Sequence, residues 1–213
     1  MNNDTGRFIT FEGPEGSGKS LQIKLLSGEF DRRGIPHTVT REPGGTEFGK
    51  EVRDILLKNG GAERKPVAEL LLYLADRYQH VSEVVRPALA RGEIVISDRY
   101  HDATLAYQGY ARGVDLEMIS VFFDRLGLLV PDNTIVFDID VEVALDRARR
   151  RNLTSDQNHL GRFEEEELDF HRRVRAGYLD LASKDPARYQ VIDGSGTPEE
   201  VHKRIMKSLE PFI

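Results

Sequence analysis

Five short runs of apolar or β-branched residues recur along the chain of 213 residues, and a stretch with helical spacing follows each of them. The runs are nearly continuous rather than alternating, which is typical of strands in a parallel sheet covered on both faces. They are residues 8–11, 37–40, 94–97, 134–139 and 189–192. The predicted helical stretches are 19–33, 47–58, 66–91, 115–127, 141–151, 163–183 and 197–210. This alternation predicts an α/β fold, doubly wound, with a five-stranded parallel sheet and helices on both faces.

Local signals refine the helical pattern at three places. Thr197-Pro198-Glu199-Glu200 offers an N-cap residue, a proline in the first turn and acidic residues beside it, which predicts a helix start. Pro87 lies inside the stretch 66–91, so a kink or break is expected near residue 86. The segment 149–163 begins with three arginines and becomes polar. It is interpreted as a charged, flexible lid within a single domain that spans 1–213, although composition alone fits a solvated surface loop equally well.

Composition narrows the classes of protein. The hydrophobic fraction of 39% and charged fraction of 31% suit a globular chain with a real core. A formal net charge of -6 argues against a nucleic-acid polymer as the main partner. The absence of cysteine excludes a disulfide scaffold and a zinc-thiolate site. Residues 1–7 lack the apolar core of a signal peptide, and residues 70–75 are too short an apolar stretch for a bilayer, so a cytoplasmic protein without membrane contact is expected.

A phosphate-binding loop follows the first predicted strand and opens the first predicted helix. Its residues satisfy the pattern G-x-x-x-x-G-K-[ST]: Gly13, Pro14, Glu15, Gly16, Ser17, Gly18, Lys19 and Ser20. In this strand–loop–helix context the backbone amides and the helix N-terminus surround an anion. Lys19 is expected to contact the β- and γ-phosphates of ATP, and Ser20 to bind magnesium. The loop alone identifies only a nucleotide-binding protein.

The ends of the other predicted strands supply candidate partners for that loop, because ligands of open α/β sheets bind beyond the carboxyl ends of the strands. Asp98 follows the third strand like a magnesium-binding acid, although an isolated aspartate there is more often a turn residue. Arg53, Arg77 and Arg99 lie near strand ends and could hold a second phosphate. Tyr73 lies four residues before Arg77, so both could face one ligand; the alternative is an amphipathic helix with an exposed arginine.

These residues together resemble the thymidylate kinase family over nearly the whole chain. The resemblance rests on the segments 11–20, 40–46, 74–77 with His80, 98–100 and 106–109. The stretches Arg-Glu-Pro-Gly-Gly and Ala-Tyr-Gln-Gly are much more specific to this family than the phosphate loop. The resemblance implies a P-loop nucleoside monophosphate kinase that uses ATP and Mg²⁺ to convert dTMP to dTDP. It also implies a homodimer, with small-molecule nucleotides as the other partners.

The resemblance implies a role for each matching residue. Glu15 would read the sugar 3′-hydroxyl, and Tyr73 would lie against the thymine. Glu42 and Asp98 would be near magnesium, and Arg147 would stack on the adenine of ATP. The loop 194–196 would touch the adenine edge. The remaining acceptor contacts implied for the phosphate, base and deoxyribose are Arg53, Arg77, Arg99, Thr104, Tyr107 and Gln108.

The catalytic set implied by the resemblance includes one arginine from the lid. The variable positions of the phosphate loop carry no arginine, and family members of this kind place it in the lid instead. Four candidates stay open: Arg149, Arg150, Arg151 and Arg162. Together with Lys19, Glu15 and Arg99, one of them would neutralise the phosphoryl group as it moves directly, in line, to the acceptor.

Two other functions remain open on the residues. One is a kinase for a different nucleotide or nucleoside, because Ala103 stands where the family often has a serine near the base. The other is a nucleotide-dependent switch. The chain lacks the Asn-Lys-x-Asp motif by which GTPases recognise guanine, and this argues against a switch. Acceptor-dependent release of ADP separates these functions.

Overall fold

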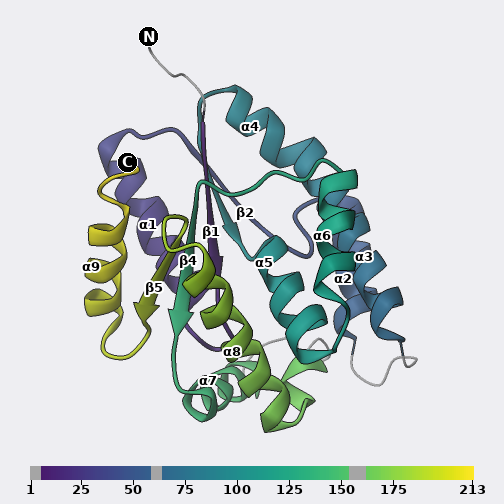
Figure 1. The fold of residues 1–213 in the computed structure, drawn as a ribbon. Helices are drawn as coiled ribbons and strands as arrows, with labels where there is room; N and C mark the ends of the chain where they lie inside the picture. The colour runs from purple at the N-terminus through teal and green to yellow at the C-terminus, as the bar shows by residue number, and fades with distance from the viewer. Residues whose placement is uncertain (1–5, 59–63, 154–161) are drawn as a thin grey trace.

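A computed structural model describes residues 6–58, 64–153 and 162–213 of the chain. Within these residues five strands form one sheet, parallel throughout, in the order β2-β3-β1-β4-β5 (Figure 1). The strands are β1 (Arg7–Glu12), β2 (His37–Arg41), β3 (Ile94–Asp98), β4 (Asn133–Asp138) and β5 (Tyr189–Asp193). The three central strands are almost entirely buried, as a sheet with both faces covered requires.

Helical segments connect the strands and cover the sheet. The α-helices are α1 (Lys19–Arg33), α2 (Glu47–Leu57), α3 (Pro66–His80), α4 (Arg86–Ala90), α5 (His101–Thr104), α6 (Leu116–Arg125), α7 (Val141–Leu153), α8 (Leu168–Lys184) and α9 (Pro198–Leu209). Wider π-type turns form η1 (Val81–Val85) and η2 (Leu105–Ala111), and a 3₁₀ turn forms η4 (Arg162–Glu165). In the described parts of the chain, no helix has both the length and the apolar character needed to cross a membrane.

Alternate residues of each central strand pack on opposite faces. On one face Ile9 of β1 belongs to a cluster with Leu26 of α1 and Ile205 of α9. These two helices lie on the same side of the sheet (Figure 1). On the other face Phe8 of β1 packs with η1 and α4, and Val136 of β4 packs with α8 and η2. The sheet therefore holds two helical layers in place, which fixes the carboxyl ends of β1, β3 and β4 side by side.

The predicted α/β fold is confirmed, and the predicted signals at residues 86 and 197 are confirmed as well. A π-type segment, η1, interrupts the long helical stretch just before Pro87. Thr197 and Glu200 form a reciprocal capping box at the start of α9. One helical segment was not predicted: α5 and η2 run from His101 to Ala111. The predicted helix from residue 163 begins instead at Leu168, after the turn η4.

Candidate active site

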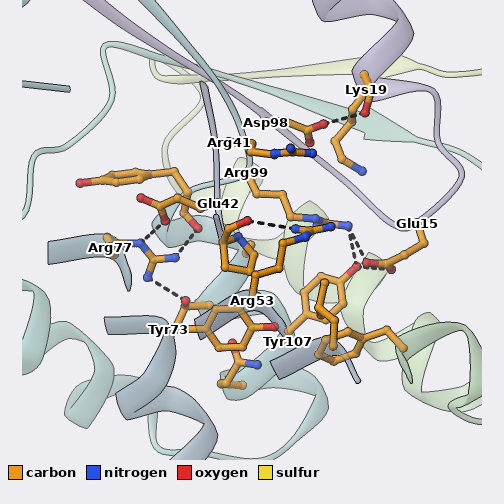
Figure 2. Close-up of a pocket in the computed structure, with 18 of the residues that line it drawn as sticks. Glu15, Lys19, Arg41, Glu42, Arg53, Tyr73, Arg77, Asp98, Arg99 and Tyr107 are labelled. Atoms are coloured by element: carbon orange, nitrogen blue, oxygen red, sulfur yellow. Dashed lines mark hydrogen bonds and ion pairs between the residues drawn. The ribbon is translucent and has the colours of Figure 1, made fainter. Parts of the chain in front are cut away.

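A cavity of about 340 Å³ opens at the carboxyl ends of β1, β2 and β3 (Figure 2). The phosphate loop forms one end, and residues from α2, α3, η2 and η4 form the other. The lining residues are Glu15, Gly16, Lys19, Ser20, Arg41, Glu42, Pro43, Arg53, Leu57, Tyr73, Arg77, Asp98, Arg99, Tyr100, Ala103, Thr104, Tyr107, Gln108 and Phe163. One continuous space thus joins the expected donor-phosphate loop to the expected acceptor residues.

Lys19 is held inside its own loop. Its ammonium group donates to the carbonyl oxygens of Gly13 at 3.0 Å and Pro14 at 2.8 Å, and to the hydroxyl of Ser17 at 3.3 Å. Burial and the nearby charge of Arg99 lower the pKa of Lys19 to about 8. A bound phosphate would replace these neutral acceptors with an anion, so the loop is set up for such a ligand.

Two other segments lie against the phosphate loop. A Cβ atom added to Gly16 would meet the carbonyl oxygen of Ala144 at 1.9 Å, so the loop packs directly on α7. A Cβ atom on Gly194 would lie 3.8 Å from the carbonyl oxygen of Ser17, which places the loop 194–196 beside the same cradle. The residues expected to contact adenine, Arg147 on α7 and the loop after β5, are therefore on elements that flank the phosphate loop.

The side chains of Ser20 and Asp98 are in direct contact. The Ser20 hydroxyl donates to Oδ2 of Asp98 at 2.7 Å (Figure 2). The residues that the structure describes contain no cluster of three or more acidic or histidine side chains that could hold a metal. This arrangement fits Mg²⁺, which proteins commonly bind through one or two side chains while substrate phosphates and water supply the other oxygens.

Arg99 is the centre of a polar network at the acceptor end. Its Nη2 atom donates to Oε1 of Glu15 at 2.7 Å and to the Tyr107 hydroxyl at 3.1 Å, and Nη1 donates to the Tyr178 hydroxyl at 3.1 Å. The backbone φ of Arg99 is 71°, a strained value for a residue with a side chain. Burial alone would raise the pKa of Glu15, but Arg99 and Lys19 hold it below its usual range.

Glu12 lies beneath this network, at the end of β1. One carboxylate oxygen accepts the backbone N–H of Tyr100 at 2.7 Å, and the other accepts the Tyr178 hydroxyl at 2.8 Å. Burial and the nearby Asp102 raise the pKa of Glu12 to about 8. The carboxyl group thus holds Tyr100, which follows Arg99 in the chain, and Tyr178, whose hydroxyl accepts a hydrogen bond from Arg99. It is not among the residues that line the cavity.

Glu42 and Arg77 form a buried pair beside the cavity. The Arg77 Nε atom donates to Oε2 of Glu42 at 2.7 Å, and the remaining guanidinium nitrogens donate to Thr104 and to the Tyr100 carbonyl. His80 Nδ1 lies 2.7 Å from the other oxygen of Glu42. Burial alone would raise the pKa of Glu42, but Arg77 and His80 hold it low. Both oxygens of Glu42 are therefore engaged by side chains, and the residue lines the same cavity as Ser20 and Asp98. Its expected place near magnesium stays a prediction.

Two arginines of the cavity have few partners. Arg53, on α2, donates to the carbonyl oxygen of Pro43 at 3.0 Å. Arg41, at the end of β2, donates to no group among the described residues, and neither arginine has a described carboxylate within ion-pair distance. Burial and the charge of Arg41 lower the pKa of Arg53. These two guanidinium groups are the cations most available to an incoming anion.

The base-reading candidates lie together. Tyr73 from α3 lines the cavity with Thr104 and Gln108 from the segment 101–111. The side-chain nitrogen of Gln108 donates to Glu69, a carboxylate that is 1% exposed. Tyr73 and Glu69 are four residues apart on α3, so one helix face serves both.

The lid arginines take different positions. Arg162 lies at the acceptor end, where its Nη1 atom is 2.6 Å from Oε2 of Glu69 and donates to the Leu56 carbonyl at 3.1 Å. Arg149 and Arg150 are exposed on α7, and Arg150 is paired with Asp146. The side chain of Arg151 and residues 154–161 of the predicted lid lie outside the described residues.

Some residues of the site were not assigned from the sequence. Arg41 belongs to the Arg-Glu-Pro-Gly-Gly stretch, and its place at a strand end was the signal that could have identified it. Glu12 is a carboxylate ending a buried apolar strand, which is itself an unusual pattern. Glu69 and Tyr178 had no such signal, because a single polar residue on an amphipathic helix is ordinary.

Comparison with known proteins agrees with this geometry. A sequence model described as thymidylate kinase matches residues 11–205. The chain is 49% identical over 201 residues to a thymidylate kinase of Nitratidesulfovibrio vulgaris, covering 93% of this chain and 90% of that protein. It is 50% identical over 199 residues to one of Syntrophotalea carbinolica, covering 93% and 92%.

A solved structure supports the same assignment. The crystal structure of thymidylate kinase from Ehrlichia chaffeensis superposes with a TM-score of 0.75 at 34% identity, covering 97% of this chain and 99% of that one. Sequence, fold and site thus agree, and the chain belongs to the thymidylate kinase family of ATP-dependent nucleoside monophosphate kinases.

Proposed function

We propose that this enzyme transfers the γ-phosphoryl group of ATP to thymidylate, with Mg²⁺ bound, and produces dTDP for the synthesis of dTTP. The observation that carries this proposal is the single cavity that runs from Lys19 in the phosphate loop to Tyr73, Tyr107 and Gln108 at the acceptor end. A switch protein needs only the first of these ends. A kinase needs both ends within one space, so that the two phosphates meet.

At the donor end the phosphate loop and α1 hold ATP. The loop amides and the N-terminus of α1 attract its phosphates, and Lys19 exchanges its carbonyl partners for phosphate oxygens. The adenine lies toward Arg147 and the loop 194–196, which flank the phosphate loop. Ser20 and Asp98 would hold Mg²⁺, which when bound supplies charge neutralisation to the phosphates.

At the acceptor end aromatic and cationic side chains hold thymidylate. Tyr73 packs on the base, while Thr104 and Gln108 contact its polar edge. Tyr107 lies against the deoxyribose and disfavours a 2′-hydroxyl, and Glu15 accepts the 3′-hydroxyl. Arg53 and Arg99 attract the phosphate, and Glu42 keeps Arg77 in place beside them.

Catalysis by these residues is positioning and charge neutralisation. The acceptor phosphate is already ionised near neutral pH, so its oxygen attacks in line without a strong general base. Lys19 and Arg99 line the cavity and neutralise phosphate charge, and one arginine of the segment 149–163 adds charge to the transferring group. Closing such a site against water prevents wasteful hydrolysis of ATP.

The test is release of ADP from ATP and Mg²⁺ with each monophosphate in turn. Strong turnover with thymidylate, weaker turnover with deoxyuridylate and negligible turnover with the rest is the expected result. Equal slow turnover without any acceptor would show an NTPase or switch instead. Preference for another monophosphate would keep the mechanism and change the substrate.

We also propose that the enzyme is a cytoplasmic homodimer. The helices α2, α3 and α6 lie on one side of the molecule (Figure 1) and expose large apolar side chains. These side chains are Phe48, Ile55, Val67, Leu71, Tyr78, Met118 and Val121. Exposed apolar side chains gathered on neighbouring helices are typical of a protein interface. Sedimentation equilibrium tests it, and a monomer at micromolar concentration would contradict it.

A further inference from the structure

Three separate contacts hold the backbone around Arg99 in its unusual conformation. The N–H of Arg99, whose φ is 71°, donates to the carbonyl oxygen of Phe11 at 3.0 Å. Its own carbonyl oxygen accepts the Ser97 hydroxyl at 2.7 Å. The next N–H, that of Tyr100, donates to the carboxylate of Glu12 at 2.7 Å. A strained residue persists where its surroundings determine its conformation in this way, and such residues are concentrated at functional sites.

The end of the Arg99 side chain is fixed as well. Its Nη2 atom donates to Glu15 and to the Tyr107 hydroxyl, which line the cavity together with Arg99 (Figure 2). Its Nη1 atom donates at 3.1 Å to the hydroxyl of Tyr178, which is not among the lining residues. Three of the five guanidinium N–H groups are therefore engaged by described residues. The guanidinium is thus held both from the cavity side and from the core side.

Tyr178 reaches Arg99 from α8. It is 1% exposed, and burial raises the pKa of its hydroxyl well above the usual value, so the proton stays on the hydroxyl. The hydroxyl donates to Oε2 of Glu12 at 2.8 Å. A phenol has one hydrogen to donate, whereas an arginine can only donate. Because Glu12 takes that hydrogen, the Tyr178 oxygen is left as an acceptor for Arg99.

Glu12 therefore acts on Arg99 by two routes. One carboxylate oxygen holds the backbone after Arg99 through Tyr100, and the other holds the guanidinium through Tyr178. Glu12 is also the last residue of β1, directly before Gly13 of the phosphate loop. The same carboxylate thus fixes Arg99 relative to the strand from which the phosphate loop begins.

We propose that Tyr178 is a positioning residue for phosphoryl transfer, which acts by holding the Arg99 guanidinium in place beside the phosphates. Its hydroxyl reaches the reaction only through Arg99, because Tyr178 does not line the cavity. The position of a charged group matters strongly here, since a misplacement of about 1 Å in an active site can cost about 100-fold in rate. This role rests on the proposed function, because it concerns the transfer to the acceptor phosphate.

Tyr178→Phe tests the proposal, because it removes only the hydroxyl. The ring stays, and with it the packing against Tyr107, whose ring centroid is 6.4 Å away. We expect kcat with thymidylate to fall about 10-fold. The KM for ATP, and the affinity for thymidine measured by calorimetry, should stay unchanged, since neither depends on the direction of the Arg99 guanidinium. An unchanged kcat, or an equal loss of thymidine affinity, would overturn the proposal.

Tyr110→Phe is the matched control. Tyr110 lies where η2 packs on α8, against Gly177, and its hydroxyl donates to Asp180. It does not line the cavity and has no described contact with Arg99. The control removes the same chemical group at the same helix contact and should leave kcat unchanged. A similar decrease of kcat in both variants would assign the effect to the packing of α8 and contradict the positioning role.

Arg99→Met tests whether Tyr178 acts through Arg99. In this background Tyr178→Phe should cause no further decrease in kcat, because the group that it positions is gone. A further decrease as large as in the wild-type background would show an independent structural effect and refute the proposal. Failure of the proposed function itself would appear earlier, as missing turnover of thymidylate by the wild type.

Discussion

The side-chain nitrogen of Gln108 donates to Oε1 of Glu69 at 2.9 Å, and both residues are 1% exposed. Burial alone would raise the pKa of Glu69, but Gln108, Arg112 and Arg162 hold it below its usual range, so the carboxylate is ionised near neutral pH. An ionised carboxylate only accepts hydrogen bonds. The NH₂ group of Gln108 must therefore face Glu69, which directs its oxygen away from that carboxylate.

Glu69→Gln should weaken the selection of the base. With an amide in place of the carboxylate, either end of the Gln108 amide can face residue 69, so a fixed acceptor oxygen is no longer presented. Such an oxygen suits the N3–H donor of thymine and repels the N3 lone pair of cytosine. We expect the ratio of kcat/KM for thymidylate over deoxycytidylate to fall about 10-fold or more.

Arg112→Gln serves as the control for that variant. Nε of Arg112 lies 3.3 Å from Oε1 of Glu69, and replacing Arg112 does not remove either partner of the hydrogen bond between Gln108 and Glu69. It should change stability without changing the ratio of the two substrates. An unaltered ratio in a folded Glu69→Gln protein would refute the orienting role.

The binding of ATP should depend on pH through Lys19. Burial and Arg99 lower the pKa of Lys19 to about 8, so the group is protonated below pH 8 and loses its charge above it. Phosphates favour the charged form. We expect constant affinity for ATP below about pH 8 and a decrease of up to about 10-fold per pH unit above it.

Calorimetry at pH 8 in buffers of different ionisation enthalpy measures the accompanying proton uptake. Lys19→Arg stays charged throughout this range, and its weaker affinity should not vary with pH. The stability of the protein without ligand should change with pH in the opposite direction. Because the pKa of Lys19 in the folded protein lies below its ordinary value of 10.5, the contribution of Lys19 to the free energy of unfolding increases from pH 8 to 10.5. Binding that is independent of pH up to 9.5 would contradict the shift.

Ser20→Ala should raise the concentration of Mg²⁺ needed for half-maximal activity. The exposed hydroxyl beside Asp98 is a proposed metal ligand, and its removal is expected to weaken metal activation about 10- to 100-fold. Titration of activity against Mg²⁺ at fixed ATP measures this change. Ser20→Thr retains the hydroxyl and should recover the wild-type response, whereas a loss of equal size in both variants would point to steric disturbance.

Gly16→Ala should lower the unfolding temperature more than Gly18→Ala. Both glycines have positive φ, 75° and 97°, so both substitutions introduce backbone strain. Only at Gly16 would the new Cβ atom meet another chain segment, the carbonyl of Ala144, while nothing lies within 4 Å of it at Gly18. Thermal unfolding without ligand isolates this contact, and equal decreases would show that α7 moves aside freely.

The sequence predicted the sheet and the strand–loop–helix setting of the phosphate loop. A continuous apolar strand such as 94–97 and the phosphate loop at the end of β1 are each determined by a few neighbouring residues, so they can be recognised from the sequence. The unpredicted helical segment 101–111 begins with a histidine and an aspartate and contains a glycine, which obscure its period. Its helical form depends on packing against α8, where Gly177 lies against Tyr110.

At the other end of the cavity, the sequence indicated which residues lie there but not which of them form hydrogen bonds or ion pairs with each other. The chain shows that Glu42 and Arg77 are near the site, yet only the fold reveals that they satisfy each other. Similarly, nothing local indicates that Tyr178, eighty residues beyond the third strand, contacts both Glu12 and Arg99. Pairings between distant segments are set by tertiary packing, which spacing along the chain does not encode.

The strand order has a consequence for how such an enzyme can change. The residues proposed to bind the acceptor come mainly from the β2 and β3 side of the sheet. The elements that flank the phosphate loop, the proposed donor site, follow β4 and β5. The central strand β1 is the boundary between these halves. Mutations that alter the preference for one nucleotide can therefore accumulate on one half of the sheet while the other half stays intact, which makes the two specificities separable in evolution and in engineering.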